Sequence, residues 1–245
     1  MKFFIAAPFG NYLKFNSHSN IIPVTGTWTL EHRGGLVFRI WRIIKTMRYD
    51  RKNNGWTNKL GLPNPGIYSG LKRINPNEVL SIAAIESDDF NKLSKIIPTT
   101  QSLEINLSCP NLDDKQPLSW HDAALFTDKK NNRKYCIAKI SPETTREQLS
   151  FLIDQLGFSQ IHCCNTLPVK EGGLSGKSLI PYVENLIKVI RENWGDSVEI
   201  IAGGGVNSSQ DAINYINLGA NYISLGTICF SPWKIKKIDQ PPIIC

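Results

Sequence analysis

Short runs of apolar and β-branched residues recur along the chain and predict a regular series of strands. Several of these runs are apolar without interruption, which is typical of parallel strands covered on both faces. Eight runs can be distinguished, at residues 3–7, 21–24, 79–85, 102–107, 136–140, 160–164, 198–202 and 222–225.

Segments with apolar residues at helical spacing separate most of the later strands, at 88–96, 143–156, 179–194 and 208–218. Polar residues at 141–144 and 207–210 provide start signals for two of these helices. Eight strands alternating with helices favour an α/β fold of the (β/α)8 TIM-barrel type over a doubly wound sheet. No linker or internal repeat divides the chain, so residues 1–245 are predicted to form a single domain.

Two connections are shorter than this fold usually has. About a dozen residues, 9–20, separate the first two strands, which is too few for a full crossover helix. Only residues 228–245 follow the last strand and its Gly226-Thr227 turn. We therefore expect a reduced first crossover and a truncated last helix.

Net charge and the positions of the cysteines bear on possible partners and on the cellular compartment. The chain has 28 Lys and Arg against 21 Asp and Glu, a net charge of +7 that is spread along the sequence and selects no partner by itself. The densest basic stretch, 39–48, also has apolar residues at helical spacing. It predicts an amphipathic helix docked on the barrel, with a membrane-surface or partner-binding helix as the alternative.

Six cysteines, at 109, 136, 163, 164, 229 and 245, lie mostly in strand-like runs, which is typical of a reduced, cytoplasmic protein. Cys163 and Cys164 point to opposite faces of one strand, and the four His are scattered, so no metal site is predicted. The first apolar run ends at Pro8. It is too short for a membrane span, and we expect no integral membrane segment.

Polar clusters directly follow the predicted strands, at 25–27, 106–111, 139–142, 165–166, 203–205 and 226–227. The carboxyl ends of barrel strands share one face, so these clusters should converge on one pocket. Cys109 lies there between two carboxamides, Asn106 and Asn111, and could act as a base or nucleophile. The alternative is a cysteine that only closes a strand.

Glycine loops after the last two strands, together with 172–176, suggest a phosphate site built from backbone N–H groups. Lys139 could place a positive charge beside an electron-rich ring such as a flavin. A solvent-facing Lys at a strand end is the alternative.

The motifs resemble those of the dihydroorotate dehydrogenases, FMN-dependent barrel enzymes of de novo pyrimidine (UMP) biosynthesis. Seven motifs occur in the family's order, at 58–64, 106–111, 139–142, 165–166, 172–176, 203–206 and 226–227. The resemblance implies an oxidoreductase that converts dihydroorotate to orotate, with Cys109 as the base and hydride transfer to FMN. A cysteine base is similar to the soluble class, which includes homodimers. No residue selects the final electron acceptor.

The resemblance also implies site residues. Substrate-binding residues would be Asn58, Leu60, Gly61, Leu62, Asn106, Asn111, Asn165 and Thr166. Cofactor-binding residues would be Ala7, Thr27, Asn106, Lys139, Asn165, Gly176, Gly204, Gly205, Gly226 and Thr227.

The chain departs from the family where the soluble class has a Lys near the flavin, because Gly26 stands there. Two other functions stay open. A tRNA-dihydrouridine synthase would use a similar barrel, but that family has Gly in place of Ser108 and an Asn-Gly-Asp run that 203–206 lacks. The second open function is that of a barrel that binds FMN or phosphate without catalysing a reaction. We expect a small-molecule substrate and no nucleic-acid partner.

Overall fold

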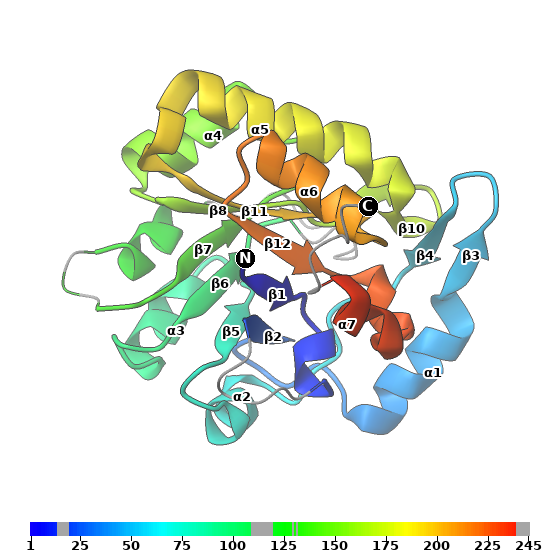
Figure 1. Cartoon of the computed structure of the whole chain (residues 1–245). Coiled ribbons are helices and arrows are strands. Elements are labelled where there is room, and N and C mark those ends of the chain that lie inside the picture. Colours follow the sequence, from blue (N-terminus) through cyan, green and yellow to red (C-terminus); the bar gives the residue numbers. More distant parts are fainter. Residues whose placement is uncertain (14–19, 109–119, 129, 131, 239–245) are drawn as a thin grey trace.

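The computed structural model describes residues 1–13, 20–108, 120–128, 130 and 132–238. Eight parallel strands close into a barrel in the order β1-β12-β11-β8-β7-β6-β5-β2, as the sequence predicts (Figure 1). The strands are β1 (Phe3–Ile5), β2 (Ile21–Trp28), β5 (Val79–Ile82), β6 (Leu103–Asn106), β7 (Cys136–Lys139), β8 (Gln160–Cys163), β11 (Glu199–Gly203) and β12 (Tyr222–Leu225). Pairing of β1 with both β2 and β12 closes the barrel.

Two apolar clusters stabilise the barrel. The larger packs outward-facing strand residues such as Leu80 and Ile105 against helix residues such as Val183 and Leu186. The smaller gathers residues from the early part of several strands, namely Phe4, Val24, Val79, Tyr135, Ile137 and Ile201. Side chains therefore fill the amino-terminal end of the barrel, which leaves the carboxyl end for a site.

Helices cover the outside of the barrel (Figure 1). They are α2 (Ile67–Arg73), α3 (Asp89–Ile96), α4 (Arg146–Ser150), the π-helical turn η3 (Phe151–Gln155), α5 (Ile180–Trp194), α6 (Ser209–Asn217) and α7 (Ile235–Ile238). The 3-10 turns are η1 (Phe9–Asn11), η2 (Trp120–Phe126), η4 (Lys177–Leu179), η5 (Gly195–Ser197), η6 (Thr227–Phe230) and η7 (Pro232–Lys234).

The predicted helix 143–156 begins later than expected. The Thr145 side chain accepts a hydrogen bond from the backbone N–H of Gln148, and Oε1 of Gln148 accepts one from the backbone N–H of Thr145, so a capping box starts the helix at Arg146. By contrast, Ser208 caps α6 where the sequence predicts it. The described residues between β1 and β2 contain the turn η1, and α7 runs to the last described residue, Ile238. The reduced first crossover and the truncated last helix stay predictions, because residues 14–19 and 239–245 lie outside the described ranges.

A second, antiparallel sheet accompanies the barrel, in the order β3-β4-β10-β9. Its strands are β3 (Arg48–Asp50), β4 (Gly55–Asn58), β9 (Leu167–Val169) and β10 (Gly172–Gly176). The pairing of β4 with β10 sets Asn58 opposite Gly173, although these residues are distant in sequence. Figure 1 shows β3, β4 and β10 together at one side of the barrel. The sequence analysis does not predict this sheet.

Helix α1 (Leu36–Thr46) forms as the basic stretch predicts, but one of its sides, with Val37, Trp41 and Ile44, is exposed to solvent. None of its residues is buried, and it lies beside the β3–β4 hairpin at the edge of the molecule (Figure 1). The prediction that it packs on the barrel is therefore wrong. None of the helices in the described ranges is long and apolar enough to cross a bilayer.

Candidate active site

One cavity of about 920 Å³ opens at the carboxyl end of the barrel strands. Most of the predicted site residues line it: Ala7, Thr27, Asn58, Leu60, Leu62, Asn106, Lys139, Asn165, Thr166, Gly176, Gly204, Gly205, Gly226 and Thr227. Gly61 is not among the lining residues, and its carbonyl accepts a hydrogen bond from Arg33. Cys109 and Asn111 lie outside the described residues.

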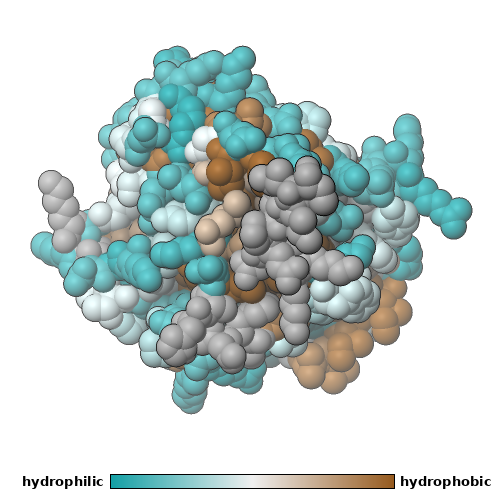
Figure 2. Space-filling model, viewed as in Figure 1, coloured by the Kyte–Doolittle hydropathy of each residue, from teal (hydrophilic) through white to brown (hydrophobic). Residues whose placement is uncertain are grey.

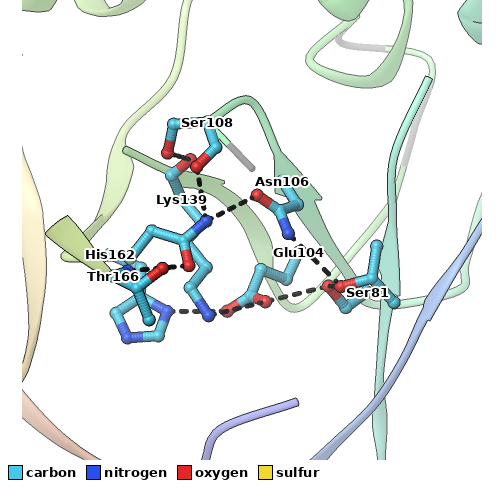
Figure 3. Close-up of polar contacts among 9 residues, drawn as sticks. Ser81, Glu104, Asn106, Ser108, Lys139, His162 and Thr166 are labelled. Carbon is cyan, nitrogen blue, oxygen red and sulfur yellow. Dashed lines mark hydrogen bonds and ion pairs between the residues drawn. The ribbon is translucent and has the colours of Figure 1, made fainter. Parts of the chain in front are cut away.

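A buried ion cluster forms the floor of this cavity. The Glu104 carboxylate lies 3.8 Å from Nζ of Lys139 and 2.7 Å from Nδ1 of His162 (Figure 3). Ser81 donates a further hydrogen bond to Glu104, at 2.9 Å. The four side chains come from four consecutive strands of the barrel, β5 to β8, where Ser81 pairs in register with Glu104 and Lys139 with His162.

The protonation states of this cluster follow from its geometry. Burial raises the pKa of Glu104, but the charges of Lys139 and His162 and the hydrogen bonds from His162 and Ser81 outweigh it and hold the pKa at about 2. Burial lowers the pKa of His162, more than the adjacent carboxylate raises it. Glu104 is therefore ionised and His162 neutral near pH 7. A carboxylate only accepts hydrogen bonds, so Nδ1 of His162 carries the proton.

A chain of hydrogen bonds connects this cluster to the predicted substrate side of the cavity. Asn165 donates to Oδ1 of Asn106 at 3.0 Å, and Asn106 donates to Oγ1 of Thr27 at 3.4 Å. Thr27 shares a hydrogen bond of 3.0 Å with Ser81, which donates to Glu104. The two Asn side chains are thus held in fixed orientations. Figure 3 shows Asn106 among these hydrogen bonds. Asn165 also donates to the backbone carbonyl of Ser108, at 2.7 Å.

The loop after β11 has a shape that suits an anion. Gly204 and Gly205 have φ of +131° and +76°, which side-chain-bearing residues rarely adopt. A Cβ on Gly205 would lie 2.5 Å from the Ile180 side chain at the start of α5. Tyr215 donates a hydrogen bond to the Gly204 carbonyl at 2.6 Å and fixes the loop. Within the described residues, the backbone N–H groups of Gly204 and Gly205 donate to no protein acceptor.

Gly26, where the resemblance would place a Lys, has no room for any side chain. Its φ is +105°, and a Cβ there would lie 2.6 Å from the Ser81 carbonyl and from the Trp28 ring. Asn11 holds this residue by accepting from its N–H at 3.1 Å and donating to its carbonyl. Lys139 is thus the one cavity-lining lysine among the described residues.

Hydrogen bonds from Asn64 and Asn58 fix residues 58–66, which form one wall of the cavity. The buried Asn64 side chain accepts from the backbone N–H groups of Thr29 and Gly66 and donates to the Leu62 carbonyl. Asn58 donates to the carbonyl of Gly173 on β10, at 3.3 Å. Pairing of β4 with β10 therefore positions Asn58 at the cavity.

The sequence analysis missed several residues that line or support the cavity, above all Glu104, His162 and Cys164. A signal was present for Glu104. It precedes Asn106 by two positions on the same strand, so both side chains face the barrel interior, and an acidic residue there needs a partner. Cys164 lines the cavity as a neutral thiol, because burial raises its pKa to about 12.

The dihydroorotate dehydrogenase family model matches residues 25–241. The chain belongs to this family. Its relatives include the catalytic subunits of dihydroorotate dehydrogenase B (NAD(+)) from Endomicrobium trichonymphae and Thermotoga petrophila. The first is 28% identical over 83% of this chain and 72% of the relative. The second is 27% identical over 96% and 92%.

The fold is also that of a solved family member. The crystal structure of ligand-free DHODH from Eimeria tenella superposes with a TM-score of 0.65, at 18% identity, over 88% of this chain and 75% of that one. As a member of the dihydroorotate dehydrogenase family, the chain is an oxidoreductase that acts on CH–CH bonds.

Proposed function

We propose that this protein oxidises dihydroorotate to orotate with FMN as its bound cofactor, in one domain formed by residues 1–245. The observation that carries the proposal is that side chains from separate strand ends, predicted from sequence to hold substrate and flavin, line one cavity. Membership of the dihydroorotate dehydrogenase family supports the same reaction.

The residues present fit FMN. Gly204, Gly205, Gly226, Thr227 and Gly176 would hold the phosphate through backbone N–H groups, since the left-handed glycines leave no Cβ in the way. Lys139 would lie near the flavin ring, where a positive charge stabilises an anionic reduced ring. Ala7, Thr27, Asn106 and Asn165 would complete the cofactor contacts.

Asn side chains would orient the substrate. Orotate is planar and carries both donors and acceptors, which carboxamides can match without adding net charge. Asn58, Asn106, Asn111 and Asn165 would provide these contacts, together with Thr166 and the backbone around Leu60, Gly61 and Leu62. The existing hydrogen bonds of Asn106 and Asn165 preorganise two of them.

Cys109 is proposed as the base. Its thiolate would take the proton from C5 of dihydroorotate while a hydride leaves C6, and bound FMN would accept that hydride. Asn165 donates a hydrogen bond to the carbonyl of Ser108, the residue before Cys109 in the sequence. We propose a small-molecule substrate and no nucleic-acid partner, and we leave the final electron acceptor open.

The test is anaerobic reduction of the flavin. Protein reconstituted with FMN should bleach on addition of dihydroorotate, and Cys109→Ala should bleach about 10²–10⁴ times more slowly while still binding FMN. Cys136→Ala is the matched control, since Cys136 begins β7 at the opposite end of the barrel and its pKa is raised to about 12 by burial. Equal rates for Cys109→Ala and the parent would refute the assigned base.

Ligand competition separates the alternatives. Orotate should perturb the flavin absorbance with micromolar-scale affinity, and unmodified tRNA should not displace it. Binding of tRNA that weakens steeply with salt, with no response to orotate, would favour the dihydrouridine synthase. Bound FMN that neither responds to orotate nor bleaches with dihydroorotate would favour a non-catalytic barrel.

A further inference from the structure

Helix α1 exposes its apolar side chains to solvent. Val37 is 82% exposed, Ile44 71% and Trp41 48%, and Leu36, Phe38 and Ile40 are exposed as well. In Figure 2 the hydrophobic surface at the lower right coincides with the place of α1 in Figure 1. A contiguous apolar patch of this kind indicates an interaction site more often than chance exposure.

The side of α1 that faces the protein carries both arginines and apolar residues. Arg42 donates to the backbone carbonyl of Leu60 at 3.2 Å and to that of Lys59. The guanidinium of Arg39 lies over the Tyr12 ring, 5.3 Å from its centroid. These arginine contacts hold α1 with Val37, Trp41 and Ile44 outward.

The surroundings of the apolar patch are basic. Lys45, Arg48, Arg51 and Lys52 are exposed on α1 and on the adjoining β3–β4 hairpin. No acidic residue occurs between Glu31 and Asp50. The Asp50 carboxylate already accepts hydrogen bonds from Asn53 and from the backbone N–H of Lys52. Any surface that covers this patch must therefore tolerate or provide negative charge.

We propose that α1 binds the surface of an anionic membrane, lying in the interface with Val37, Trp41 and Ile44 inserted among the acyl chains. A basic helix with aromatic and aliphatic residues on one side has the composition of such interfacial helices. The flanking lysines and arginines would meet lipid phosphates. A second copy of this chain is a poorer occupant, because it would bring a like-charged basic rim to the same contact.

The helix also contributes to the cavity. Leu36, Ile40, Ile43 and Met47 line its opening, so the apolar patch is continuous with the cavity wall. A membrane-bound α1 places this opening against the bilayer. The proposal concerns the surface only and does not depend on dihydroorotate as substrate.

The experiment is cosedimentation of the full-length, FMN-reconstituted protein with vesicles of phosphatidylcholine alone or with 30% phosphatidylglycerol. The parent should bind the anionic vesicles at least tenfold more tightly than the neutral ones. The Val37→Ser/Ile44→Ser double variant should bind them at least tenfold more weakly. Lys45→Gln and Lys52→Gln should each weaken binding roughly fivefold. The matched control is Tyr68→Ser/Leu218→Ser, which removes exposed apolar side chains on α2 and after α6 and should bind like the parent.

Two outcomes would overturn the proposal. The first is absence of binding to anionic vesicles, or binding that the Val37→Ser/Ile44→Ser variant leaves unchanged. The second is a stable dimer in light scattering that this variant dissociates, because α1 would then be a surface between two copies of the chain. Both variants carry substitutions at exposed positions, and equal thermal unfolding would verify their folding.

Discussion

The buried pair of Glu104 and Lys139 allows a quantitative test of the electrostatics beneath the cavity. The two charged atoms are 3.8 Å apart, and the side chains are only 1% and 8% exposed. With an effective dielectric constant of about 20, charges at this distance attract by about 4 kcal/mol. Glu104→Gln alone leaves the ammonium of Lys139 buried without its counter-ion, which typically costs about 3–5 kcal/mol of unfolding free energy.

A double-mutant cycle isolates the pair. Glu104→Gln, Lys139→Met and the double variant would be unfolded in urea at pH 7 without added FMN, and we expect a coupling energy of about 2–4 kcal/mol. The double variant should be less destabilised than the sum of the two single variants, because it buries no unpaired charge.

The chain provides a control pair with the same separation. Lys188 and Glu192 on α5 are also 3.8 Å apart, but their side chains are 70% and 59% exposed. Water screens such a pair, so the same cycle there should give about 0.3–0.5 kcal/mol. Equal coupling energies at the two sites would refute the argument that burial strengthens the ion cluster.

Three further predictions concern the cavity. Gly205→Val should abolish FMN binding in a fluorescence titration, whereas Gly157→Val, at the same φ of +76° but where a Cβ would make only ordinary van der Waals contact with Thr127, should not. Asn165→Ala should weaken orotate binding about tenfold in a flavin absorbance titration, and an unchanged affinity would contradict its role. Because burial lowers the pKa of His162, only the unfolded state takes up this proton just below pH 6.5. The unfolding free energy should therefore fall as the pH drops through that range. His162→Asn should reduce this pH-dependent loss of stability, measured by urea titrations at several pH values. An identical pH dependence in the variant and the parent would count against a neutral His162.

Much of the barrel can be predicted from local sequence. Runs such as 79–85 and 198–202 have the uninterrupted apolar character of strands covered on both faces. This pattern can be recognised within each run, without knowledge of the tertiary structure. The placement of polar clusters at strand ends follows from the same pattern, since parallel strands in a barrel all end at one face. Cavity-lining residues such as Lys139 and Asn165 could therefore be named in advance.

Other features depend on contacts between distant segments. Three features have no signature within a single window of sequence: the pairing of β4 with β10, the choice of Lys139 and His162 as partners of Glu104, and the side of α1 that faces outward. The hydrophobic pattern of residues 36–46 predicts a helix but not which side faces the protein. The side that faces the protein makes contacts with distant residues, such as the hydrogen bonds from Arg42 to the carbonyl groups of Lys59 and Leu60, and these form only once the chain has folded.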